Sequence, residues 1–260
     1  MDKELDYDFH YCDIVFRTNN KAKITISYLR AMKGNPIEGN VNLKIARFLS
    51  EKKNYKQAEF RYRKASMMMP FHSSVFNEWG FLLDEQGKKE GQEELFRKVI
   101  EIDPNSVDGL CNLGVVLTNK CQFTEAIALF EKALENNPNH VHSLNNLASV
   151  YLTIGEYEKA IERFKKAVES DKDHFVSYIN LALAYNCLGK DAEAKENYEK
   201  TSVFLERYPD KKEMIVLSCK ELLNLVVKEE FLGEGNEEEK REHKKKLGKA
   251  LKEMISFVKQ

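Results

Sequence analysis

The stretch that decides the fold is residues 107–140, VDGLCNLGVVLTNKCQFTEAIALFEKALENNPNH. It ends two residues after Pro138, and three earlier prolines, at positions 36, 70 and 104, precede it at a constant interval of 34 residues. A fixed period of this length indicates an array in which one structural unit is repeated along the chain. Cutting the sequence at this period gives units that begin at residues 5, 39, 73, 107, 141 and 175.

Small and aromatic residues recur at fixed places in these units. The eighth residue is always small and the twenty-fourth is always aromatic: Cys12, Ala46, Gly80, Gly114, Ala148 and Ala182 for the former, Tyr28, Tyr62, Phe96, Phe130, Phe164 and Tyr198 for the latter. This spacing predicts two antiparallel helices per unit, in which the small residue lets the helices approach around the aromatic ring. A proline at position 32 is expected to stop the second helix.

This pattern resembles the tetratricopeptide repeat family over roughly residues 39–205, and the unit at 107–140 matches best. The resemblance implies an all-α fold, a right-handed superhelical α-solenoid of antiparallel helix pairs. We divide the chain into a degenerate N-terminal helix pair (1–38), five repeats (39–208) and two C-terminal capping helices (209–260). The five repeats are expected at 39–72, 73–106, 107–140, 141–174 and 175–208.

Composition argues against several functional classes. The 41 Lys and Arg residues balance 42 Asp and Glu residues, so no global field favours nucleic acid or a membrane surface. The five cysteines are odd in number and form no CxxC pair, which favours reduced thiols in a cytoplasmic protein. The sequence also lacks a signal peptide at Met1 and any stretch apolar enough to span a membrane.

A ladder of asparagines is the candidate binding site. The sixth residue of three successive units is Asn112, Asn146 or Asn180, on first helices that carry almost no charge and are expected to line the concave groove. A carboxamide pairs with a peptide backbone without regard to its side chains. The ladder resembles the one that grips extended peptide in the O-linked N-acetylglucosamine transferase. We expect Asn77, Asn145 and Asp108 to add contacts to a partner protein or peptide.

Other interpretations of the same residues stay open or are disfavoured. In the alternative interpretation, the asparagines only tie neighbouring helices together. The carboxylate clamp of the family, which binds acidic chaperone tails, needs cations that this chain does not supply at the corresponding positions. His140 and His142 are expected to lie too far from the histidines of other repeats for a shared metal ion, so we expect no metal and no cofactor. No catalytic motif is present, and we expect no enzyme.

The sequence therefore predicts a non-catalytic, cytoplasmic adaptor or scaffold that holds a partner peptide or helix in its groove. Two alternatives are a self-assembling structural protein and a recognition subunit of a larger enzyme or secretion complex. Fold alone does not decide among them.

Overall fold

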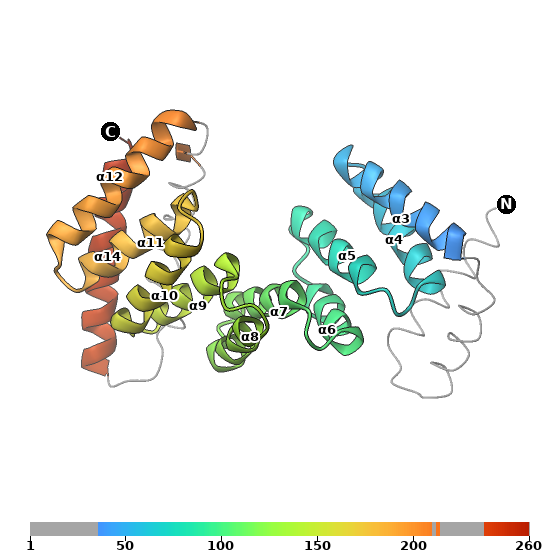
Figure 1. Ribbon diagram of the computed structural model, residues 1–260, viewed down its shortest axis with the longest axis horizontal. Helices are drawn as coiled ribbons and strands as arrows, with labels where there is room; N and C mark the ends of the chain where they lie inside the picture. Colours follow the sequence, from blue (N-terminus) through green and yellow to red (C-terminus); the bar gives the residue numbers. More distant parts are fainter. Residues whose placement is uncertain (1–35, 210–211, 214–236, 260) are drawn as a thin grey trace. The chain divides into compact units, whose positions relative to one another are not determined.

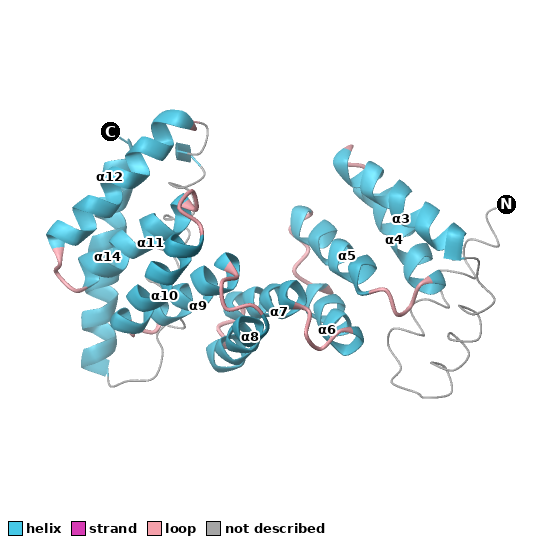
Figure 2. Cartoon of the chain, viewed as in Figure 1, coloured by secondary structure: helices cyan, strands magenta, loops and turns pink. Residues whose placement is uncertain are grey.

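The computed structural model describes residues 36–209, 212–213 and 237–259, and within these ranges every regular element is an α-helix (Figures 1 and 2). The predicted all-α class is confirmed. The chain divides into two compact units, residues 1–109 and 110–260, which we describe separately. The first unit contains α3 (Pro36–Glu51), α4 (Tyr55–Met68), α5 (Ser73–Glu85) and α6 (Gln92–Ile102).

The helix α7 (Val107–Asn119) begins at the boundary, and most of it belongs to the second unit. The remaining helices are α8 (Phe123–Asn136), α9 (Val141–Thr153), α10 (Tyr157–Ser170), α11 (Phe175–Cys187), α12 (Asp191–Arg207) and α14 (Glu237–Lys259). The predicted helix pair at 1–38 and the predicted cap helix at 214–232 lie almost wholly outside the described residues. None of the described helices has the length and hydropathy that a membrane crossing needs.

The two helices of a repeat meet where a small residue faces an aromatic ring. A Cβ atom added to Gly80 would lie 2.6 Å from the ring of Phe96, and one added to Gly114 would lie 2.6 Å from Phe130. Ala148 and Phe164 occupy the same positions in the next repeat, and both are fully buried. Close packing at these crossings explains why the eighth and twenty-fourth positions repeat so strictly.

The turn before α6 contains two residues in the left-handed backbone region, Gly87 and Gly91, and the corresponding turn of each other described repeat contains one. The left-handed residue that these turns share lies at one fixed position. It is the fifteenth residue every time: Lys53, Gly87, Cys121, Gly155 and Gly189, with φ between 56° and 87°. Glycine adopts this conformation without steric cost, whereas a side chain with a Cβ does so at a penalty. Lys53 and Cys121 therefore store backbone strain that the three glycines avoid.

The second helices do not all depend on proline for their ends, which corrects the sequence interpretation. The helix α10 ends at Ser170 although Lys172 replaces the proline, and the backbone N–H of Asp173 bonds to the Asp171 side chain. The same short turn, an Asx turn, follows α8, where Asn137 accepts from the N–H of Asn139. The helix α12 ends at Arg207, two residues before Pro209, so proline stops this helix three residues later in its repeat than it stops α4, α6 and α8.

We expect Cys121→Gly to raise the free energy of unfolding by about 1 kcal/mol, because it relieves a left-handed residue that carries a Cβ. Urea unfolding followed by circular dichroism measures the change. Cys121→Ala is the matched control, since it removes the thiol and keeps the Cβ. A gain of equal size in the alanine variant would show that the thiol, and not the backbone, is responsible.

Candidate peptide-binding face

The three asparagines of the predicted ladder lie on successive first helices of the second unit. Asn112, Asn146 and Asn180 occupy equivalent places on α7, α9 and α11, and all three side chains are half-buried. We call the side of these helices that carries them the ladder face. The helices α9 and α11 contain no Asp, Glu, Lys or Arg, and α7 contains only Asp108. Apart from Asp108, the ladder face is thus built from side chains without a formal charge.

Asn145, which the sequence analysis placed among the partner contacts, is buried and joins two repeats. Its side chain is 8% exposed, and its Oδ1 atom accepts from Ser177 Oγ and from Asn180 Nδ2, each at 3.2 Å. Because two donors share this oxygen, Asn145 fixes α11 against α9. In this structure Asn145 supports the ladder from beneath.

The serine in this network determines the hydrogen position on a neighbouring histidine. Ser177 is fully buried, and its single hydroxyl hydrogen goes to Asn145, so His174 Nδ1, at 2.7 Å, must donate to the serine oxygen. Burial and the nearby His142 lower the pKa of His174 below its usual value of 6.5. The imidazole is therefore neutral at pH 7, with its proton on Nδ1.

The bonds that hold Asn146 and Asn180 leave hydrogen-bonding capacity on both. Asn180 uses one amide hydrogen for Asn145, and Asn146 uses one for the thiol of Cys111 at 3.6 Å. A carboxamide has two such hydrogens and a carbonyl oxygen with two lone pairs. Each side chain can thus tie two repeats together and still present a donor and an acceptor to a ligand.

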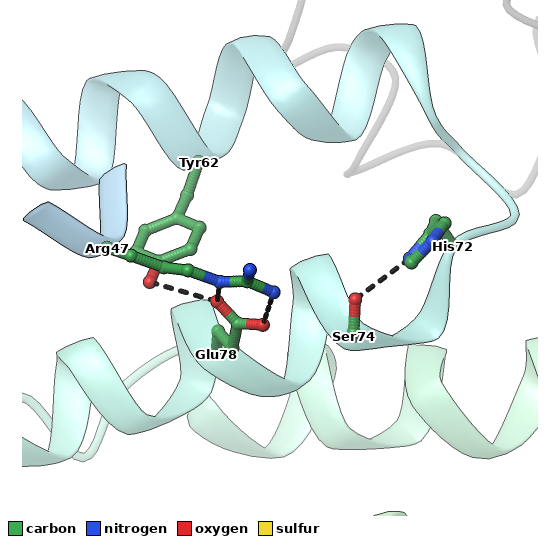
Figure 3. A network of polar contacts seen from close by, with 5 residues as sticks. All are labelled: Arg47, Tyr62, His72, Ser74 and Glu78. Atoms are coloured by element: carbon green, nitrogen blue, oxygen red, sulfur yellow. Dashed lines mark hydrogen bonds and ion pairs between the residues drawn. The ribbon is translucent and has the colours of Figure 1, made fainter. Parts of the chain in front are cut away.

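The first unit uses the same position differently (Figure 3). Glu78 takes the place of the ladder asparagine on α5, and both its oxygens accept from Arg47 of α3, at 2.6 and 2.7 Å. This hydrogen-bonded pair raises the pKa of Arg47, while burial raises the pKa of the adjacent Tyr62 to about 12. In both units, therefore, a side chain at the sixth position contacts the preceding repeat. The contact is an ion pair in the first unit and an amide hydrogen bond in the second.

Two further predicted contacts, Asn77 and Asp108, belong to the first unit. Asn77 is half-buried on α5, and Asp108 is exposed in the first turn of α7, four residues before Asn112. Asp108 and Asn112 therefore share one side of the same helix. Both Asn77 and Asp108 already take part in interactions within the protein.

The structure corrects the expected separation of the histidines. The His142 ring lies 5.7 Å from the His140 ring and 5.6 Å from the His174 ring, measured between centroids. His142 is the second residue of α9, so its side chain extends past the loop toward the next repeat. Over the described part of the chain, however, no three His, Cys, Asp or Glu side chains are placed to hold a metal ion.

The last helix, α14, covers one end of the ladder face and packs against α11 (Figure 1). Thr153 and Cys187 lie seven residues, or two turns, after Asn146 and Asn180, and their exposed fractions are 7% and 3%. The equivalent residue on α7, Asn119, is exposed. Asn186 Nδ2 also contacts Glu253 of α14 at 3.4 Å. The ladder face is therefore open along α7 and partly covered on α9 and α11.

His243 anchors α14 to the repeat at 141–174. Its Nε2 atom lies 2.7 Å from the carbonyl oxygen of Thr153 and donates to it, so in the neutral ring Nδ1 accepts from the hydroxyl of Tyr157, at 2.5 Å. Burial lowers the pKa of His243. Sequence analysis missed this contact, because it joins residues 86 and 90 positions apart and His243 lies outside the repeat pattern.

The fold and this face define a helical repeat protein of the kind that binds other proteins or peptides. Family models for the tetratricopeptide repeat match residues 75–106 and 106–173. The chain thus contains tetratricopeptide repeats, and the predicted resemblance and solenoid fold are confirmed. No curated protein matches this sequence.

Solved structures with the same fold share about one residue in five with this chain. A crystal structure of MamA is 22% identical with a TM-score of 0.57, and the match covers 64% of this chain and 97% of that one. MamA residues 41–end from Desulfovibrio magneticus RS-1 is 20% identical with a TM-score of 0.58, covering 66% and 97%. YrrB, described as a TPR protein with an unusual peptide-binding site, is 20% identical with a TM-score of 0.51, covering 65% and 86%.

The neighbours Asn145 and Asn146 should differ sharply when truncated. Asn145→Ala removes the acceptor of Ser177 and Asn180, and we expect it to lower the free energy of unfolding by about 1–3 kcal/mol. Asn146→Ala removes only long contacts, and we expect a loss below about 1 kcal/mol. Chemical unfolding of the two variants measures both values. Equal losses would contradict the assignment of a purely supporting role to Asn145.

Stability should fall in mild acid because of His243 and His174. Their pKa values are lowered in the folded state, so the unfolded chain binds more protons as the pH falls below 6.5. The stabilisation is complete above pH 6.5 and is lost as the pH falls toward the folded-state pKa values. His243→Gln retains a donor for Thr153 and cannot titrate, so we expect a weaker dependence of the melting temperature between about pH 7.5 and pH 5.5. An unchanged dependence would exclude His243 as a contributor.

Proposed function

We propose that this protein is a non-catalytic adaptor that holds an extended segment of a partner protein on the ladder face, the inner groove of the second unit. Asn112, Asn146 and Asn180 contact the partner backbone. Asp108 borders the same side of α7, and Asn145 supports the ladder from beneath. For Asn77, on the first unit, we keep the role of an additional contact.

One observation carries this proposal: the amides of Asn146 and Asn180 are half-buried and incompletely used, on helices that contain no Asp, Glu, Lys or Arg. Neutral donors and acceptors at one place in each repeat match the regular backbone of an extended chain, which offers an N–H and a C=O per residue. A site of this kind recognises the main chain more than the side chains. The description of YrrB as a peptide-binding protein of this fold is in keeping with it.

The proposed place of action is the cytoplasm. Cys111, Cys121 and Cys187 are free cysteines, and Cys121 is exposed on a turn. Free thiols are typical of a reducing compartment. The partner and the pathway are left to experiment.

The test begins with a library of random peptides displayed on phage and selected on the full-length protein. The best binder is then measured against wild type and against the triple variant Asn112→Ala, Asn146→Ala, Asn180→Ala. Because each neutral hydrogen bond contributes about 1 kcal/mol, we expect the triple variant to bind roughly 100-fold more weakly. The matched control replaces three exposed asparagines, Asn105 and Asn139 in loops and Asn136 at the end of α8, with alanine and should bind normally.

If the protein recognises the peptide backbone, changes to the peptide itself should also alter binding. N-methylation of its central amides should abolish binding, whereas exchange of its side chains should have little effect. Unaltered affinity in the triple variant would contradict the proposal. If the selected peptides bind away from the ladder and the protein instead forms concentration-dependent oligomers in sedimentation, self-assembly becomes the better account.

A further inference from the structure

The helix α14 has two chemically different sides. Its buried side carries Leu247, Ala250, Leu251 and Met254, each at most 2% exposed. Arg241, Lys245, Lys249 and Lys252 follow one another at intervals of four, four and three residues, and all four are exposed. At 100° per residue these four lie together, opposite the buried side. We call them the cationic stripe.

The middle of α14 carries many more cations than carboxylates, although Glu237, Glu238, Glu239 and Glu253 flank it. Residues 240–252 contain seven Lys or Arg and a single Glu, in a chain whose net charge is -1. Lys249 lies 3.7 Å from Glu253, and the one Glu within the segment, Glu242, lies 3.6 Å from Lys246, outside the stripe. Within the described part of α14, no carboxylate is paired with Arg241, Lys245 or Lys252. Four like charges thus share one side of a helix, with one acidic partner among them.

The helix dipole does not explain these cations. Glu237 and Glu238, in the first turn of α14, are placed to complement the positive end of the helix dipole. The dipole effect falls off within the first and last turns. The helix α14 extends to Lys259, so the stripe lies in its middle turns. Repulsion between cations at i and i+4 is unfavourable there and needs another reason.

The position of the stripe limits what it can meet. The buried side of α14 packs on the ladder face at the ends of α9 and α11, where His243 meets Thr153 and Asn186 meets Glu253. The cationic stripe therefore points away from these helices on the side of the repeats that carries the ladder. It extends over twelve residues, from Arg241 to Lys252, or about 16 Å along the helix.

We propose that the cationic stripe docks an extended acidic segment of a partner protein. Cations four residues apart on a helix are separated by about 6 Å along its axis. Alternate side chains of an extended peptide are about 6.7 Å apart, so carboxylates at every second residue match this spacing. The stripe lies on a different helix from Asn112, Asn146 and Asn180, and the inference does not rest on the function proposed for them.

A peptide fits this surface better than a nucleic acid or a membrane. Single-stranded nucleic acid needs exposed aromatic rings for base stacking, whereas Phe257, the aromatic ring of α14, is stacked on Tyr198 at 4.9 Å. A peripheral membrane helix presents apolar side chains to the lipid, whereas those of α14 are buried against the protein. A row of cations without either feature is best matched by carboxylates.

The experiment measures the fluorescence anisotropy of a labelled ten-residue peptide, Ser-Glu repeated five times, with the full-length protein. We expect binding at about 50 mM salt and much weaker binding at about 300 mM, because exposed charges are screened. The stripe variant R241Q/K245Q/K249Q/K252Q should bind at least about 10-fold more weakly, since each exposed pair contributes little alone and the four act together.

Two controls distinguish a loss of the cationic stripe from a change in net charge and from a loss of folding. The variant K132Q/K159Q/K165Q/K195Q makes the same change in net charge at exposed lysines of α8, α10 and α12, and it should bind the peptide as wild type does. Circular dichroism melting should be unaltered in both quadruple variants. The Asn112, Asn146 and Asn180 triple variant should also retain the acidic peptide, which keeps this test distinct from that of the ladder.

Three results would overturn the inference. The first is no binding of the Ser-Glu peptide to the wild-type protein at about 50 mM salt, where screening is weak. The second is equal weakening in both quadruple variants, or equal binding of a Ser-Lys peptide. The third is a stripe-dependent affinity for polyuridylate or for phosphatidylserine vesicles that exceeds the affinity for the peptide.

Discussion

The approach of a small residue on one helix to an aromatic ring on the next sets the geometry of each repeat. Gly80 and Gly114 leave no room for a Cβ beside Phe96 and Phe130, so each helix pair is held at one crossing. Once that crossing is fixed, the outward side of the first helix is also fixed, because the side chains of a helix keep their angular order. The orientation of the ladder face is therefore set by the contact between the small residue and the aromatic ring, and no residue of the ladder face takes part in that contact.

The sixth position of the repeats joins neighbouring helices, and the proposed function gives it recognition as a second role. In the first unit it is a carboxylate satisfied by Arg47, and such a pair offers a ligand little that is not already used. In the second unit it is an amide that bonds to the preceding repeat with one hydrogen and keeps others. The sixth residue of a repeat can bind a ligand only with the hydrogen-bonding groups that its contacts to neighbouring helices leave unused. A repeat without such groups has a structural role alone.

The sequence allowed the repeats to be placed almost to the residue, because their signals are local and periodic. The first helices α5, α7, α9 and α11 begin at residues 73, 107, 141 and 175, the predicted starts of the units. The departures have local causes: α6 begins at Gln92, three residues later than its counterparts, since Gly91 adopts a left-handed conformation before it.

The candidate site was harder to predict than the fold. The ladder could be read from spacing, but the burial of Asn145 depends on Ser177 and Asn180 of the next repeat. The proximity of His142 to His174 depends on how two side chains leave their helices. The docking of α14 brings His243 to Thr153, ninety positions earlier in the chain. The repeat period of the sequence does not predict a contact of that kind. Contacts across repeats need coordinates, whereas contacts within one repeat leave a pattern in the sequence.

The partial cover of the ladder face by α14 has one more consequence. The row of amides already has a direction, because Asn146 and Asn180 each bond to the repeat that precedes them. The helix α14 covers the ends of α9 and α11 and leaves α7 open, so the two ends of the row also differ in access. A single helix outside the repeats thus adds a steric difference to the chemical one, and a chain held as we propose would enter from the side of α7.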